Sequence, residues 1–105
     1  MPTDTEHKLQ SLIQMYREGY RNPTIDQSID KLMALEIAQH RKERNRLQMR
    51  LNAFEQEHGM DSAVFYEKFQ AGELGDEMAF VEWSVFYDLY QATQKRLDEL
   101  KSDAI

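Results

Sequence analysis

"IDQSIDKLMALEIAQHRKERNRLQMRLNAFEQEH", residues 25–58, contains neither glycine nor proline and predicts one long helix, roughly 50 Å in length at 1.5 Å per residue. Eight of its residues recur at alternating spacings of four and three, the pattern of a coiled-coil seam. This seam consists of Met33, Ile37, His40, Arg44, Leu47, Leu51, Phe54 and His58. A single small domain cannot bury so long a seam, so we expect an antiparallel partner helix, or a second subunit that packs on Met33, Ile37, Leu47 and Leu51.

Helical periodicity continues on both sides of this segment. The whole chain has only four glycines and two prolines, which favours helix throughout. The predicted helices cover about residues 5–17, 25–58, 61–70 and 77–101. We therefore predict an all-α fold with one domain over residues 1–105. The second and fourth helices form a long antiparallel hairpin, the first and the short third helix pack alongside, and the whole is a dimeric helical bundle.

Short polar residues are expected to cap three of these helices. Thr24 and Gln27 have the spacing of a capping box at the start of the long helix. Asp61 and Asp76 precede the third and fourth helices, where a carboxylate can accept a hydrogen bond from a free backbone N–H. Gly59 follows the long helix and is expected to adopt the left-handed conformation that ends it.

Composition narrows the class of protein. Cysteine is absent, which excludes disulfides, thiolate metal sites and a cysteine nucleophile and favours a reducing, cytoplasmic setting. The opening residues are polar, and no apolar run approaches the roughly 18 residues that a membrane span needs. We expect neither export by a standard signal nor membrane insertion.

Acidity is concentrated in the second half of the chain. Residues 1–50 carry a net charge of +2, residues 51–92 carry −8 and residues 93–105 are neutral. The acidic part includes "FYEKFQAGELGDEMAFVEWSVFYDLY", residues 65–90, in which most aromatic residues have the spacing of a core between two helices. The expected core residues are Phe65, Phe69, Phe80, Trp83, Tyr87 and Tyr90, with Val81 and Ser84 on the same broad face of the last helix.

Several residues of this acidic segment do not fit that core. Aromatic and aliphatic side chains among carboxylates are typical of an interface with a basic protein. The candidate partner-binding residues are Tyr66, Glu73, Glu77, Glu82, Phe86 and Leu89. A helix that packs between two neighbouring helices would explain the same pattern without a partner.

The stretch "HRKERNRLQMR", residues 40–50, is basic and supports a different function. Lys42, Arg46 and Arg50 recur every four residues on one helix face, a spacing suited to successive phosphates of a nucleic acid. The acidic second half would repel a polyanion, so we favour pairing of this stretch with acids of residues 73–88, within or between subunits. The alternative function is that of a nucleic-acid-associated or regulatory helical protein that uses residues 41–50, with these three residues as the nucleic-acid contacts.

No pattern in the sequence specifies a catalytic or metal site. Glu55 and His58 have the Glu-x-x-His spacing of di-iron bundles, which require this motif on two helices, but it occurs here once. Glu36, His40 and Glu43 share a helix face without a matching second helix. We therefore expect no cofactor, no metal and no enzymatic activity. An active site built from residues of two subunits would leave no motif in a single chain, and this is the third alternative.

The second half of the chain resembles a largely uncharacterised family of short, all-helical prokaryotic proteins. The resemblance rests on a Phe-Tyr-x-x-Phe, Gly-Glu-Leu-Gly-Asp and Glu-Trp pattern. The matching residues are Phe54, Gly59, Met60, Phe65, Tyr66, Phe69, Gly72, Glu73, Leu74, Gly75, Asp76, Phe80, Glu82 and Trp83. Some members look like antitoxins of two-gene toxin–antitoxin modules. The resemblance thus implies a non-catalytic interaction protein that binds a basic, toxin-like partner.

Overall fold

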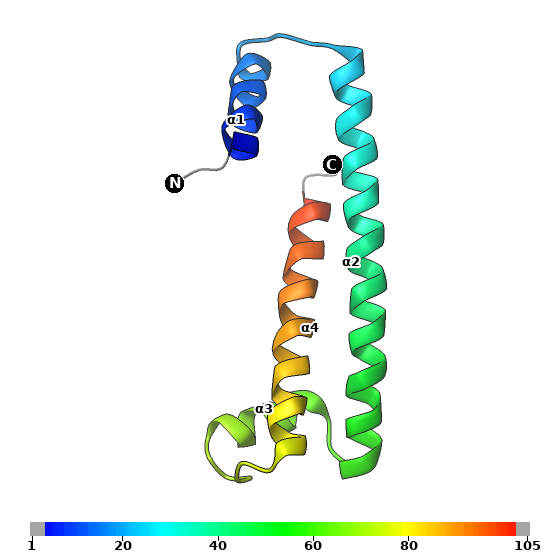
Figure 1. Ribbon diagram of the computed structural model, residues 1–105, viewed down its shortest axis with the longest axis vertical. Coiled ribbons are helices and arrows are strands. Elements are labelled where there is room, and N and C mark those ends of the chain that lie inside the picture. Colours follow the sequence, from blue (N-terminus) through cyan, green and yellow to red (C-terminus); the bar gives the residue numbers. More distant parts are fainter. Residues whose placement is uncertain (1–3, 103–105) are drawn as a thin grey trace. The chain divides into compact units, whose positions relative to one another are not determined.

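The computed structural model describes residues 4–102, and these form four helices (Figure 1). They are α1 (Asp4–Arg17), α2 (Pro23–His58), α3 (Ser62–Gln70) and α4 (Met78–Ser102). No strand occurs in this described range. The all-α prediction is confirmed, and each helix begins and ends within two residues of the predicted position.

The chain divides into two compact units, Met1–Met33 and Ala34–Ile105. The boundary falls inside α2, which contributes its first turns to the N-terminal unit and its longer remainder to the C-terminal unit. α4 has 25 residues, enough to run along the whole of residues 34–58. The length of α2 thus reflects two partners, α1 for its start and α4 for its remainder.

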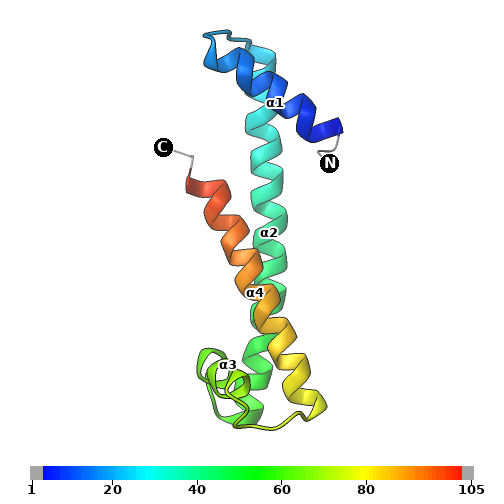
Figure 2. The same ribbon diagram turned by 90° about the vertical axis from the view of Figure 1, so that its left-hand side faces the viewer.

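In the C-terminal unit, α2 and α4 lie side by side and run in opposite directions (Figure 1, Figure 2). Residue numbers fall along α2 as they rise along α4, as expected for an antiparallel pair. The contacts join His58 to Phe80 with 5.3 Å between ring centroids, Phe54 to Trp83 with 5.6 Å, and the Arg50 guanidinium to the Phe86 ring at 5.3 Å. The predicted hairpin of the second and fourth helices is therefore confirmed.

Trp83 is the centre of the core of this unit. Its side chain is 0% exposed and stacks on Phe65 of α3, with 3.8 Å between ring centroids and 5° between ring planes. The indole Nε1–H donates a hydrogen bond of 2.9 Å to Oγ of Ser62, which is also buried. Leu51 completes the buried cluster, and the remaining predicted core aromatics, Phe69, Phe80, Tyr87 and Tyr90, pack against it partly buried.

The predicted seam of α2 faces inward. Leu47 and Leu51 are buried, and the other six seam residues are partly buried. Packing within one chain therefore already covers Leu47 and Leu51, at 4% and 2% exposure. These two leucines do not need the second subunit that the sequence led us to expect there.

The helix caps differ from the predicted ones. α2 begins at Pro23, one residue before the expected Thr24 cap, and Asn22 Oδ1 accepts the hydrogen bond from the Thr24 N–H at 2.9 Å. Proline is well suited to the first helical position because its missing N–H would have no partner there. Asn22 therefore takes the capping role that we expected of Thr24. At α4, the backbone carbonyl of Glu77 accepts the first helical hydrogen bonds, so the N-cap position belongs to Glu77 and not to Asp76.

The start of α3 is capped from α2. Asp61 occupies the N-cap position in extended conformation, but its side chain makes no capping hydrogen bond. Glu55 Oε2 instead accepts a hydrogen bond of 2.8 Å from the Ser62 backbone N–H. Gly59, at a φ of 62°, allows the tight reversal that brings Glu55 and Ser62 together, and its predicted left-handed conformation is confirmed.

We expect Glu55→Ala to lower the free energy of unfolding by about 0.5–2 kcal/mol, the usual cost of losing a capping oxygen. Asp61→Ala is the matched control and should leave stability nearly unchanged, because the Asp61 side chain caps nothing. Urea unfolding at one fixed protein concentration, followed by the fluorescence of Trp83, measures both. A larger loss in the Asp61 variant would contradict the observed capping.

The N-terminal unit pairs α1 with the first turns of α2. The Tyr16 hydroxyl donates a hydrogen bond of 2.6 Å to Asp26 Oδ1, and the Arg21 guanidinium lies 5.1 Å from the centroid of the Tyr16 ring. No described residue of this unit, residues 4–33, is buried. Its two helices are thus tied together by polar contacts around the connecting loop, without a core of their own.

Candidate protein-interaction surface

α4 carries a second apolar face besides the one in the core. Met78, Val81, Val85 and Leu89 recur at spacings of three and four residues and are 72%, 38%, 49% and 47% exposed. Val85 is two residues from Trp83, about 200° around the helix, so the row lies on the side opposite Trp83. Leu89, at its C-terminal end, also lines a groove between α2 and α4. We call these four residues the α4 ridge. Apolar side chains that share one exposed face are typical of an interaction surface.

Carboxylates border the α4 ridge on both sides. At about 100° per residue, Glu82 lies on one flank, and Glu77 and Asp88 lie on the other. All three residues are exposed. The ridge therefore has the organisation of an apolar centre with an acidic rim, within the part of the chain that carries the net charge of −8 over residues 51–92.

The structure brings together only some of the six predicted partner-binding residues. Glu77, Glu82 and Leu89 lie on or beside the α4 ridge, and Glu73 is exposed in the turn between α3 and α4. Tyr66 and Phe86 are partly buried instead.

Both aromatic residues make contacts within the C-terminal unit. Tyr66 donates a hydrogen bond of 2.6 Å to Asp88 Oδ1, and its ring is 4.9 Å from that of Tyr87. Phe86 lies against Phe54, at 6.1 Å between centroids, and below the guanidinium of Arg50. The anchors that remain free for a partner are thus aliphatic rather than aromatic.

Three of the four residues of the α4 ridge are not among the predicted partner-binding residues. Val81 is expected on the core face but is exposed, and Met78 and Val85 are outside the predicted set. The sequence does contain the helical spacing from Met78 through Val85 to Leu89. However, α4 has apolar residues on two faces, and only the tertiary placement of Trp83 identifies which face is covered.

The hydrogen bond to Asp88, together with desolvation, raises the pKa of Tyr66 above its ordinary value of 10.0. The folded state then holds the phenolic proton more tightly than the unfolded chain does. Stability from this bond is present below about pH 10 and is lost as pH rises through the raised pKa. We expect Asp88→Ala to return the pKa of Tyr66 towards the ordinary value, measured by tyrosinate absorbance with Tyr66→Phe as the reference. An unchanged titration would mean that the bond does not form in solution.

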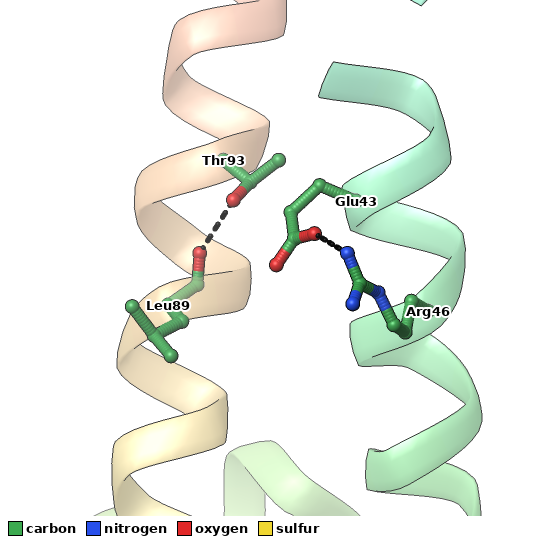
Figure 3. Close-up of polar contacts among 4 residues, drawn as sticks. All are labelled: Glu43, Arg46, Leu89 and Thr93. Carbon is green, nitrogen blue, oxygen red and sulfur yellow. Dashed lines mark hydrogen bonds and ion pairs between the residues drawn. The ribbon is translucent and has the colours of Figure 1, made fainter. Parts of the chain in front are cut away.

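A second surface lies between α2 and α4, in a groove of about 480 Å³. Its charged and polar lining comprises Gln39, His40, Lys42, Glu43 and Arg46 from α2, and Thr93 and Arg96 from α4, with Leu89 and Ala92 as its apolar part. Figure 3 shows part of this groove, where Arg46 donates to Glu43 at 2.6 Å and Thr93 Oγ1 donates to the Leu89 carbonyl at 2.8 Å. We call it the basic groove, because Lys42, Arg46 and Arg96 outnumber its one carboxylate.

The three predicted nucleic-acid residues are divided by the fold. Lys42 and Arg46 line the basic groove, whereas Arg50 lies over the Phe86 ring. Arg96 was not predicted, because its position opposite Lys42 and Arg46 depends on the antiparallel register of α2 and α4. A groove with two predicted cations and one new cation thus replaces the single-helix stripe that we expected.

The histidines and carboxylates that were weighed as metal ligands make other contacts in the structure. Glu55 caps α3, and His58 packs between Trp83 and Phe80, with 5.3 Å between ring centroids in each case. His40 Nε2 is 3.3 Å from a Glu36 carboxylate oxygen on the same helix. Within residues 4–102, no group of three or more His, Asp or Glu side chains is placed to hold a metal ion.

Over the part that the structure describes, none of the helices combines the length and the apolar character required to cross a bilayer. Comparison of the chain with protein-family models, with curated proteins and with solved structures finds no match.

Proposed function

We propose that this chain is a non-catalytic protein-interaction module that binds a basic protein partner through the α4 ridge. The observation that carries the proposal is the exposed row of Met78, Val81, Val85 and Leu89 with carboxylates on both flanks. Apolar side chains at the centre of an interface supply affinity when a partner covers them. The acidic rim selects a basic partner and accelerates its association.

An antitoxin-like role in the cytoplasm fits this surface. An antitoxin acts by covering its toxin, and an acidic face with an apolar centre suits a basic toxin. The resemblance of residues 54–83 to antitoxin-like proteins supports the same reading. A homodimer is part of the proposal, because the N-terminal unit buries none of its described residues.

The α4 ridge is tested by binding to the product of the neighbouring gene and to a synthetic basic amphipathic helix of leucine and lysine. Val85→Asp should weaken binding to a true partner at least tenfold, because a carboxylate then enters the apolar centre. Met49→Asp is the matched control, since Met49 is 73% exposed on α2 and lies outside the ridge.

The acidic rim is tested separately by replacing Glu77 and Glu82 with glutamine. Association should slow more at low salt than at high salt, while dissociation changes little. Binding that is equally strong in the Val85 and Met49 variants, or association that does not depend on salt, would contradict the proposal.

Nucleic-acid association through the basic groove is the second candidate function. It is favoured by one observation, the convergence of Arg96 on Lys42 and Arg46 from a different helix. If the groove binds single-stranded RNA, replacing these three residues with glutamine should flatten the dependence of log affinity on log salt by about 0.7 per lost contact. Arg50→Gln serves as the control because Arg50 lies over Phe86 and outside the groove. RNA affinity that is unaffected by the triple replacement would exclude this candidate.

A further inference from the structure

The N-terminal unit contains an apolar groove of about 560 Å³ between α1 and the start of α2. Its apolar lining consists of Leu9, Leu12, Ile13, Tyr16, Ile25 and Ile29. Three charged residues, Arg17, Asp26 and Asp30, also line it. We call this feature the N-terminal groove. It lies wholly within residues 4–33 and is separate from the α4 ridge and the basic groove.

The polar contacts between α1 and the start of α2 are not accompanied by a buried apolar core. α1 has 14 residues and none of them is buried. An isolated helix of this length is marginal in water, and tertiary packing of the apolar face normally provides most of its stability. Leu9 and Ile13 are each about half exposed, at 47% and 49%. The apolar residues of α1 and of the start of α2 line one groove, and the other described residues of the N-terminal unit do not fill it.

We propose that a second copy of this chain covers the N-terminal groove, so that the two N-terminal hairpins form a four-helix bundle. The inference rests on the homodimer within the proposed function and specifies its interface. Two helical hairpins that each present one apolar face bury both faces when they pack against each other. A two-fold axis would place each groove on its own counterpart.

Charge identifies a second copy as the occupant. Residues 1–33 carry four Lys/Arg and five Asp/Glu, a net charge of −1, whereas residues 34–105 carry nine and 14, a net charge of −5. The electrostatic repulsion between two copies is therefore smaller when they meet through residues 1–33 than when they meet through residues 34–105. The lining of the groove also contains both signs, Arg17 with Asp26 and Asp30, which a two-fold related copy can complement.

The same charges disfavour the other occupants. A basic partner would find an excess of only one carboxylate over residues 1–33, in contrast to the acidic rim of the α4 ridge. A membrane surface with anionic lipids would attract a helix rich in Lys and Arg around its apolar face, and α1 carries only Lys8 and Arg17 among its described residues.

The full-length chain tests the interface. Light scattering across a concentration series should give a mass near twice 12.5 kDa for the wild type. Ile13→Asp and Ile29→Asp should each raise the dimer dissociation constant at least tenfold. Met49→Asp and Val85→Asp, which place the same charge on other exposed apolar positions, should leave the dimer intact. Weaker partner binding by the Val85 variant with an unchanged dimer mass would show that the α4 ridge and this interface are separate surfaces. Partner binding that the Val85 variant retains would count against the α4 ridge alone, and a monomeric wild type would count against this interface.

Hydrogen exchange gives a measurement that does not depend on whether the aspartate variants fold. Amides of α1 in the wild type should gain protection as the protein concentration rises, while amides of α3 and the first turns of α4 should not. A mass of 12.5 kDa at every concentration would overturn the inference, as would a dimer that both groove variants leave unchanged. Binding of the monomer to phosphatidylcholine–phosphatidylglycerol vesicles with protection of α1 would also overturn it, in favour of a membrane occupant.

Discussion

Trp83→Ala should lower the free energy of unfolding by about 3–5 kcal/mol, the range for removing a large aromatic side chain from a core. Trp83 is 0% exposed and its ring contacts connect all three helices of the C-terminal unit. It stacks on Phe65 of α3 and on Phe54 and His58 of α2. A domain of this size has only about 5–15 kcal/mol of stability in total, so the variant should unfold at far lower urea concentration.

Val85→Ala is the matched control for this prediction, because Val85 lies on the same helix and is 49% exposed. An exposed substitution of this kind usually changes stability by no more than about 0.5 kcal/mol. Trp83 is the only tryptophan, so far-UV circular dichroism must replace fluorescence as the probe. Both variants should be compared at one protein concentration, since dimer formation would make stability depend on concentration. Similar unfolding curves for the two variants would contradict the central role of Trp83.

The helices and the core could be predicted from the sequence because they depend on local periodicity. The absence of glycine and proline from residues 25–58 was enough to predict the extent of α2. The alternating spacing of four and three residues identified its inward face, which includes Leu47 and Leu51. The aromatic spacing around Trp83 likewise identified most of the core. Each of these patterns is repeated over several turns, so that no single residue decides it.

The caps could not be predicted reliably because each depends on one atom. Asn22 and Thr24 are both good capping residues, and with Asn22 as the cap α2 begins at Pro23, two positions before the predicted start. At α3, Asp61 has the suitable position, but the Ser62 N–H donates its hydrogen bond to Glu55 of the preceding helix. Such competition between a local and a more distant acceptor is settled by tertiary geometry.

The charge of the candidate surfaces could be predicted from the sequence, but the apolar residues that they expose could not, because these also depend on tertiary geometry. The acidic character around Glu77 and Glu82 follows from composition, and the structure leaves both exposed. Which apolar residues are available beside them depends on packing, which covers much of Phe86 and leaves Val85 exposed. The basic groove likewise requires the register of two helices that are distant in sequence. Sequence periodicity shows which face of a helix is the most apolar, but it does not show which face of another helix packs against it.

Ser62→Ala should lower the free energy of unfolding by about 1–3 kcal/mol, because it leaves a buried donor without a partner. The Trp83 Nε1–H donates to Ser62 Oγ at 2.9 Å, and both residues are buried. Ser84→Ala is the matched control: Ser84 is also buried, but its hydroxyl donates to the Val81 carbonyl of its own helix. That replacement removes a donor and strands no buried N–H, so the expected cost is smaller.

A double-mutant cycle with Trp83→Phe separates this hydrogen bond from the packing of the indole ring. Phenylalanine has no N–H, so Ser62→Ala should cost little in the Trp83→Phe background, with a coupling energy of about 0.5–3 kcal/mol between the two sites. Urea unfolding followed by circular dichroism of the four proteins of the cycle gives the coupling directly. If Ser62→Ala is equally costly in both backgrounds, the hydroxyl stabilises the start of α3 by some other contact, and α3 is not joined to α4 through this bond.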